Sequence, residues 1–193
     1  MKKVPLLSGN YYHLYNRGVN RQPIFFCKDN WGFFIKQMRH YFNPELLSIL
    51  AYCLMPNHYH LLVYLKSNDI SKKVMQPFGT SYVKAINKQQ GRVGPLYQGP
   101  FKAKLVDSDA YLAHLTRYIH LNPVQADLAD HPADWPYSSY SDYVGVRNGT
   151  LPQTAFILSQ FASREAYGNF VEGEHEPKNL AFERKLALYS VFE

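Results

Sequence analysis

Apolar residues recur in short runs and at helical spacing along the first two thirds of the chain. Runs bounded by Gly, Pro and Asn predict strands, whereas apolar residues three or four positions apart predict helices. The pattern predicts strands at 11–17, 46–53, 58–65 and 101–106. It predicts helices at 29–41, at about 68–90 and at 110–121. Gly79 weakens the second helix in its middle, and Met55-Pro56-Asn57 is typical of the turn of a hairpin.

The order of these elements indicates the fold. The first six follow the βαββαβ plan of ferredoxin-like α+β proteins, and the third helix comes after the last strand. We therefore expect an antiparallel sheet with helices on one face and the other face open for a site. Residues 131–149 are rich in Pro, Ser, Tyr, Asp and Gly, and weaker helical patterns follow. We expect a first domain at 1–128 and a loop and helical extension packed on it at 129–193.

Charge is distributed unevenly along the 193 residues. Residues 1–121 hold 16 Lys and Arg against 5 Asp and Glu, a net charge of +11. Residues 122–193 hold 5 against 10, a net charge of −5. A basic body suggests a polyanionic partner, although a solubilising surface would give the same count. With two cysteines and no long apolar run, we expect neither a disulfide scaffold, a leader peptide nor a membrane span, and we expect the cytoplasm as location.

Two histidines begin the third predicted strand. Because strand side chains alternate, His58 and His60 share one face, about 7 Å apart along the strand. Two imidazoles on one face can bind a divalent metal ion if further ligands are supplied. Two surface histidines on either side of a packed Tyr59 would give the same pattern.

Four polar or aromatic residues share one face of the third predicted helix. Tyr111, His114, Tyr118 and Asn122 are 3, 4 and 4 positions apart. The tyrosines also fit an ordinary core, and Asn122 also fits the cap of a short helix that begins at Pro123.

Several motifs in this order resemble a known family. They are YYHLYNRGVNRQPIFF, AYCLMPNHYHLLV, YQGPFKAKLV, YIHLNPVQADL and DWPYSSYSDY, within about residues 8–145. They resemble the HUH single-tyrosine transposases, and more closely the REP-associated tyrosine transposase branch of the IS200-like transposases. The combination of MPNHYHLL with YIHLNP is far more specific than either motif alone.

The resemblance implies a DNA transposase that cuts and rejoins single-stranded DNA near hairpins through a covalent 5′-phosphotyrosine. It implies Tyr118 as the nucleophile, and His58, His60 and Asn122 as ligands of Mg²⁺ or Mn²⁺. Many relatives have Gln where this chain has the shorter Asn122. His13 and His114 are candidates for contacts behind the metal ligands or with substrate. The resemblance is compatible with either a monomer or a homodimer.

Basic and aromatic residues supply candidate DNA contacts. The basic candidates are Arg17, Arg21, Lys84, Lys88, Lys102, Lys104 and Arg117. Tyr97 and Phe101 are candidates for stacking on unpaired bases, with packing beside the fourth strand as the alternative.

Three other functions remain in competition with the transposase. One is a domesticated relative that binds hairpins without transposing. An RNA-binding ferredoxin-like domain would show an RNP pattern, which the sequence lacks, and a zinc hydrolase would need an acidic base near His58.

Overall fold

Four strands form one antiparallel sheet in the order β2-β3-β1-β4. The computed structural model describes residues 5–107 and 109–173. The strands are β1 (Tyr11–Arg17), β2 (Leu47–Met55), β3 (His58–Leu65) and β4 (Lys102–Val106). β1 and β3 lie in the centre of the sheet, and the hairpin β2–β3 turns at Pro56 and Asn57. The predicted βαββαβ order and the α+β class are confirmed.

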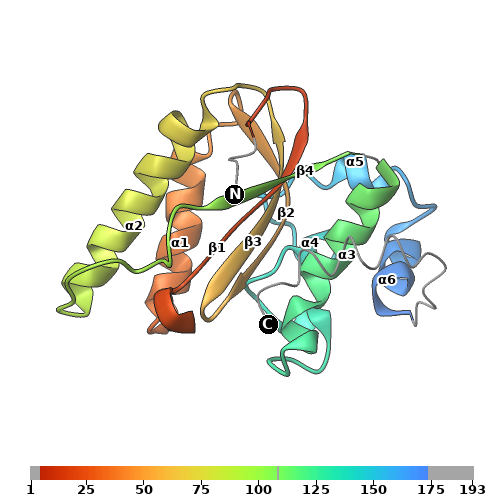
Figure 1. Ribbon diagram of the computed structural model, residues 1–193. Helices are drawn as coiled ribbons and strands as arrows, with labels where there is room; N and C mark the ends of the chain where they lie inside the picture. Colours follow the sequence, from red (N-terminus) through yellow and green to blue (C-terminus); the bar gives the residue numbers. More distant parts are fainter. Residues whose placement is uncertain (1–4, 108, 174–193) are drawn as a thin grey trace.

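Two helices cover one face of the sheet (Figure 1). They are α1 (Lys28–Tyr41) and α2 (Gln76–Gln89), and a π-helical turn, η2 (Ser71–Met75), leads into α2. Alternate strand residues such as Leu14 and Leu61 face these helices and pack in one core with Phe34 and Phe78. The predicted helix at 68–90 therefore begins irregularly, whereas its middle passes through Gly79 without interruption.

The second face of the sheet is covered as well, contrary to the expectation of an open face. Figure 1 shows α3 (Asp109–Gln125) against this face, with the segments that follow it packed outside. These segments include η3 (Pro132–Asp134), α4 (Tyr140–Tyr143), α5 (Ala155–Leu158) and α6 (Arg164–Glu172). The physical reason is that this face also carries apolar side chains, among them Ala51 and Leu62, which need cover. None of the described helices is both long enough and apolar enough to traverse a lipid bilayer.

The C-terminal end of α3 differs from the local expectation of a stop at Asn122. The helix passes through Pro123 and ends at Gln125, so Asn122 lies inside it rather than capping a new one. The Leu128 N–H donates to the Pro123 carbonyl and the Asp127 N–H donates to the Val124 carbonyl, which is a Schellman motif. Asp127 takes the left-handed conformation of that motif, with φ of 53°.

A buried histidine fixes α3 to the rest of the protein. His120 Nδ1 lies 2.7 Å from the Tyr167 hydroxyl on α6, and His120 Nε2 lies 2.7 Å from Ser139 Oγ. Ser139 Oγ in turn donates to the Tyr52 carbonyl on β2. This chain of hydrogen bonds connects α6, α3 and the sheet, and so sets how α3 sits above the strands.

Candidate functional site

The histidines lie on the α3 face of the two central strands. His60 is paired with Tyr15 of β1, and His58 is paired with Arg17 at the end of that strand. The rings of His58 and His60 have centroids 4.9 Å apart and stand perpendicular to each other. The alternation predicted from the HxH spacing therefore places both imidazoles on one face, closer together than their backbone positions.

Asn57 determines how His58 presents its ring. The side-chain oxygen of Asn57 lies 2.6 Å from His58 Nδ1, while its amide nitrogen donates to the Arg21 carbonyl at 3.1 Å. Since the Asn57 oxygen can only accept, the proton of a neutral His58 ring lies on Nδ1. Nε2 then carries a lone pair that faces the pocket. A metal-binding histidine needs this orientation, and a hydrogen bond to its other ring nitrogen commonly fixes it.

His60 shows a buried nitrogen that the protein leaves without a partner. His60 Nδ1 is 2.8 Å from His13 Nε2, whereas His60 Nε2 is buried with no hydrogen-bond partner among the described residues. When the shared proton sits on His60 Nδ1, the lone pair of His60 Nε2 is available to a ligand. His13 therefore lies behind His60, as a residue that orients a metal ligand would.

All three imidazoles are neutral near pH 7. Burial lowers the pKa of His58 to about 4, with the Arg17 charge adding to the effect and a hydrogen bond to the Asn122 side chain opposing it. Burial, assisted by the Lys104 charge, lowers the pKa of His13 to about 3, and burial holds the pKa of His60 well below its usual range. Neutral imidazoles are the form that binds metal ions.

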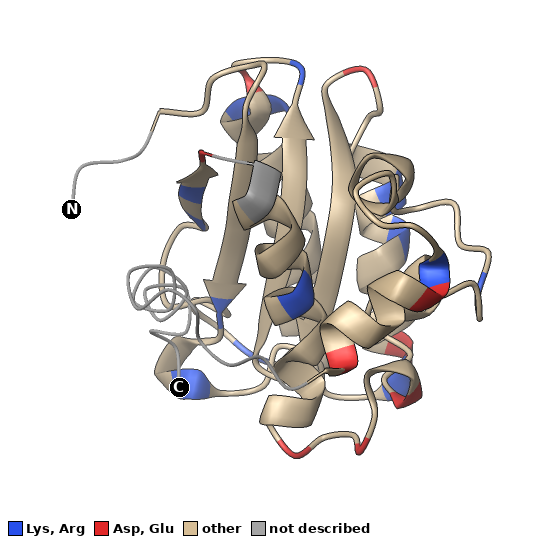
Figure 2. Ribbon diagram, turned by 90° about the vertical axis from the view of Figure 1, so that its right-hand side faces the viewer, with Lys and Arg blue, Asp and Glu red and all other residues tan. Residues whose placement is uncertain are grey.

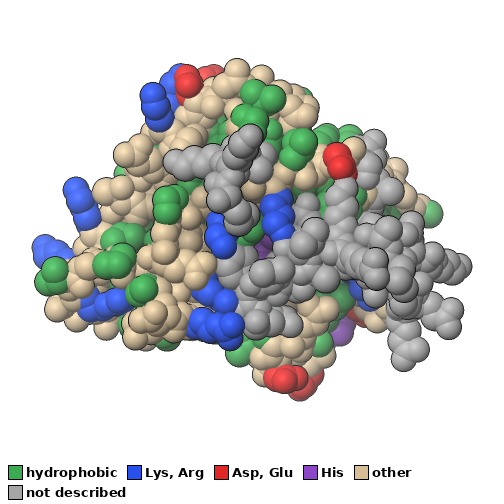
Figure 3. Space-filling model, viewed as in Figure 1, with side chains coloured by type: hydrophobic (Ala, Val, Ile, Leu, Met, Phe, Trp, Pro, Cys, Tyr) green, Lys and Arg blue, Asp and Glu red, His purple; other side chains and the backbone are tan. Residues whose placement is uncertain are grey.

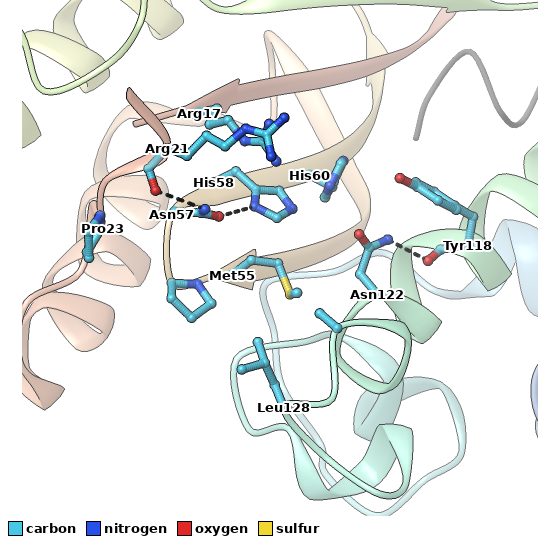
Figure 4. A pocket seen from close by; sticks show the side chains of 12 residues that line it. Arg17, Arg21, Pro23, Met55, Asn57, His58, His60, Tyr118, Asn122 and Leu128 are labelled. Atoms are coloured by element: carbon cyan, nitrogen blue, oxygen red, sulfur yellow. Dashed lines mark hydrogen bonds between the residues drawn. The ribbon is translucent and has the colours of Figure 1, made fainter. Parts of the chain in front are cut away.

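The helix α3 supplies the other two residues of the site. Asn122 Nδ2 donates to the Tyr118 carbonyl at 2.7 Å, which turns the side-chain oxygen of Asn122 toward His58 and His60 (Figure 4). The ring of Tyr118 stands perpendicular to that of His60, with centroids 5.7 Å apart. Its hydroxyl is on the side of His60 in Figure 4. One turn of helix therefore aims a phenol and an amide oxygen at the same pair of imidazoles.

These side chains fit a divalent metal ion. Within the described part of the chain, no three His, Cys, Asp or Glu side chains are placed to hold a metal. A site built on His58 and His60 would therefore take its third protein ligand from the amide oxygen of Asn122. Two nitrogen ligands and one amide oxygen suit ions of the Mg²⁺ and Mn²⁺ class less than an all-oxygen set, but water and phosphate oxygens can complete the shell.

A pocket of about 340 Å³ opens beside these residues (Figure 4). Arg17 and Arg21 line one side of it, and the described residues that line it include no acidic side chain. Lys102 and Lys104 follow on β4, on the same face of the sheet, where Lys104 is paired with His13. In Figure 3, Lys and Arg side chains gather around a histidine in the middle of the face. The site therefore lies in a basic surrounding.

Other basic candidates lie elsewhere. Arg117 donates to the carbonyls of Phe170 and Gly173, so its guanidinium is held against α6. Lys84 and Lys88 are exposed on α2, which covers the opposite face of the sheet (Figure 1). In Figure 2 the Lys and Arg segments and the Asp and Glu segments are interspersed over much of the view.

Some of the aromatic and histidine side chains predicted to contact DNA or metal also lie away from the site. The ring of His114 packs edge-on against Phe170, with centroids 5.2 Å apart, so it belongs to the contact between α3 and α6. Tyr97 and Phe101 pack against the core on the α1–α2 side. This favours packing over stacking on unpaired bases for both residues. Of the candidates beyond the metal ligands and the tyrosine, His13, Arg17 and Arg21 are the ones that the fold brings to the site.

The sequence pattern predicts only a turn at Asn57 and misses its place in the site, although a position next to His58 in a tight hairpin is a usable signal. Leu128 was also missed, because the Schellman motif that brings it to the pocket depends on the helix continuing past Pro123.

Comparison with known proteins gives a family for most of the chain. The family model described as "Transposase IS200 like" matches residues 7–122. A protein of Haemophilus influenzae named "Putative REP-associated tyrosine transposase" is 31% identical over 101 residues, which cover 47% of this chain and 57% of that protein. The match thus spans little more than half the length of that curated relative.

A solved structure of a relative shows the same fold. A REP-associated tyrosine transposase bound to a REP hairpin superposes with a TM-score of 0.58 and 19% identity, over 75% of this chain and 85% of the other. A "putative transposase" from Deinococcus radiodurans is 21% identical over 62% of this chain and 95% of its own, with a TM-score of 0.42. The family match includes both histidines, the tyrosine and the asparagine of the site, and the chain belongs to the IS200-like transposase family.

Proposed function

We propose that the protein cuts and rejoins single-stranded DNA next to a hairpin, with Tyr118 as the nucleophile. The observation that carries this proposal is the convergence of the Tyr118 ring, the Asn122 oxygen and the partnerless His60 nitrogen on one pocket. The relative whose structure contains a REP hairpin supports the substrate class.

In the proposed reaction, Tyr118 Oη attacks a phosphorus atom of the DNA backbone. The new bond joins Oη to phosphorus, and the bond from phosphorus to the 3′ oxygen breaks. The phenol proton leaves, and the departing 3′ oxygen takes up a proton. The products are a 5′-phosphotyrosine and a strand with a 3′-hydroxyl. Since the phosphotyrosine keeps the phosphodiester linkage, a 3′-hydroxyl can reverse the reaction on the same or another strand.

His58, His60 and Asn122 would hold Mg²⁺ or Mn²⁺. When bound there, such an ion supplies positive charge to the non-bridging oxygens of the phosphate under attack. Asn57 and His13 keep the two imidazoles in the tautomer and orientation that this role requires. Arg17 and Arg21 lie on the same pocket and would position the phosphate backbone.

The basic surface continues along the sheet toward β4. Lys102 and Lys104 lie on the same face as the imidazoles and would extend a path for the single strand. Each Lys or Arg that contacts a phosphate makes binding more dependent on salt. The slope of log affinity against log salt concentration therefore counts these contacts. Replacing Arg17, Arg21, Lys102 or Lys104 by Ala is expected to reduce the magnitude of this slope by about one.

The decisive experiment uses hairpin DNA from the flanks of the gene, labelled at its 5′ or 3′ end, with Mn²⁺ or with EDTA. A metal-dependent, protease-sensitive adduct is expected with the wild type and not with Tyr118→Phe. Tyr41→Phe, on α1 at the opposite face, is the matched control and should form the adduct fully. Strand cleavage without any adduct would overturn the tyrosine mechanism. Native binding without cleavage would favour a hairpin-binding protein that performs no chemistry.

A further inference from the structure

The pocket is larger than a metal ion and a phosphate require, and its lining has two parts. One part holds the two imidazoles, the tyrosine, the two asparagine amides and the two arginines. The other part is apolar and consists of Pro23, Met55, Pro56, Ala126 and Leu128. In Figure 4, Arg17 and Arg21 lie on one side of His58, and Met55 and Leu128 lie on the other. We call the five apolar residues the apolar wall.

We propose that the apolar wall is a binding subsite for one unstacked nucleobase of the strand that lies across the site. The proposal rests on the function proposed above, and it adds to it a contact with a base beside the reacting phosphate. The wall and the arginines together match a nucleotide, which has a flat apolar base on one side and an anionic phosphate on the other.

Leu128 is held at this wall by an uncommon backbone. Asp127, which precedes it, has φ of 53°, a left-handed conformation that non-glycine residues seldom adopt. The Leu128 N–H is fixed by the Pro123 carbonyl at 2.9 Å. Seven large hydrophobic side chains are exposed in the described residues, and Leu128, at 40%, is the one that lines the pocket. The helix end therefore presents an exposed leucine to the site.

The opposite edge of the wall is fixed independently. The Pro56 carbonyl accepts hydrogen bonds from the N–H groups of Ile24 and Phe25, at 2.9 and 3.3 Å. These bonds hold the turn of the hairpin against the segment that contains Pro23. Both sides of the wall are therefore formed before any ligand arrives, as in most small-molecule sites.

The chemistry of the wall predicts what it recognises. Proline, methionine, alanine and leucine side chains offer no hydrogen-bond donors for reading a base edge. We therefore expect the subsite to accept any of the four bases and to distinguish a base from an empty sugar. The contribution of one base held by such contacts corresponds to roughly a tenfold change in affinity, near the lower end of the range for bases stacked on aromatic side chains.

The test measures binding of single-stranded hairpin oligonucleotides to the full chain in the Tyr118→Phe background, which prevents covalent reaction. An abasic residue is placed at each unpaired position in turn, and each oligonucleotide is measured with and without Leu128→Ala. At one position, the abasic residue should weaken binding to the Tyr118→Phe protein with Leu128 intact by about tenfold. With Leu128→Ala, the intact oligonucleotide should bind several-fold more weakly, and the abasic residue at that position should then have little further effect.

Leu105→Ala is the matched control. Leu105 is as exposed as Leu128, at 43%, but lies on β4 and does not line the pocket. It should leave the abasic profile unchanged. The subsite is refuted if, at every position, the loss of affinity with both changes equals the product of the losses from Leu128→Ala and from the abasic residue alone.

A spectroscopic measurement gives a second readout. 2-Aminopurine at the sensitive position should become brighter on binding, because the apolar wall contains no aromatic ring to quench it by stacking. Unchanged or lower emission would contradict the proposal. Failure of the subsite differs from failure of the proposed function: an adduct with the wild type but no coupling at Leu128 refutes the subsite alone. Coupling at Leu128 without an adduct refutes the chemistry alone, and no binding to any oligonucleotide refutes both.

Discussion

His120 is buried completely, and its replacement by phenylalanine tests the packing of α3 on the sheet. The wild-type ring contacts Tyr167 and Ser139 through its two nitrogens, each at 2.7 Å. Phenylalanine has a similar shape but can neither donate nor accept. The buried Tyr167 hydroxyl then loses its contact with His120, whereas Ser139 keeps its hydrogen bonds to Tyr52.

The magnitude follows from these contacts. A buried hydroxyl left without a partner costs about 1–3 kcal/mol, and the weakened Ser139 network adds about 0.5–1 kcal/mol. We expect His120→Phe to lower the free energy of unfolding by about 2–3 kcal/mol. For a chain of this size, that loss corresponds to a decrease in Tm of roughly 4–12 °C. Urea unfolding followed by circular dichroism gives the free energy, and calorimetry gives the Tm.

Two further variants make the reasoning refutable. His40→Phe makes the same chemical change at an exposed position of α1 and should change the free energy of unfolding by less than about 0.5 kcal/mol. Tyr167→Phe combined with His120→Phe should cost less than the sum of the two single changes, because no hydroxyl is then left buried without a partner. Strict additivity, or a His120→Phe protein as stable as the wild type, would show that the network contributes nothing.

Three other predictions concern pH, backbone packing and metal affinity. Burial lowers the pKa of His120 to about 3 in the folded protein, whereas the pKa of histidine in an unfolded chain is about 6.5. As the pH falls below about 6.5, only the unfolded chain binds a proton at His120, so the free energy of unfolding decreases. Between pH 6 and 4, the free energy of unfolding of His120→Phe, measured in urea, should therefore change less with pH than that of the wild type, by up to about 1.4 kcal/mol per pH unit. Equal slopes for the two proteins would contradict this. A Cβ on Gly18 would lie 2.0 Å from the Gln22 carbonyl oxygen, so Gly18→Ala should lower both thermal stability and DNA affinity. Gly32→Ala, in α1 with open space around it, should instead raise stability by about 0.5–1 kcal/mol. Asn57→Ala should weaken Mn²⁺ binding about 10–100-fold in calorimetry with the fold intact, and wild-type affinity would exclude the orienting role.

The sequence predicted those parts of the protein in which a local pattern decides the structure. The apolar run over 58–65 predicted the bounds of β3, and the alternation of strand side chains predicted the common face of His58 and His60. The spacing of Tyr118 and Asn122 likewise predicted that the two lie one turn apart on α3. These features needed no information from distant parts of the chain.

The remaining features depend on contacts between distant residues. Pro123 opposes a continuing helix locally, but the packing of α3 between the sheet and α6 outweighs the one hydrogen bond that proline removes. The contacts of His120 join residues 19 and 47 positions apart, so no local pattern reveals them. The cover on the second face also could not be predicted, because the short segments after residue 129 have weak helical patterns.

The site is divided between two layers of the molecule. The imidazoles stand on the sheet, and the phenol and the amide of Asn122 stand on α3. In the proposed reaction, displacement of one layer relative to the other therefore changes the distance and angle between the attacking phenol oxygen and the phosphorus atom. In-line displacement at phosphorus is sensitive to such misalignment at the scale of about 1 Å. Among the described residues, none beyond 128 lines the pocket, yet Ser139 and Tyr167 hold α3 in place. Their replacement should therefore slow the reaction while leaving the composition of the pocket untouched, so the alignment of the two layers can be adjusted by mutation far from the chemistry.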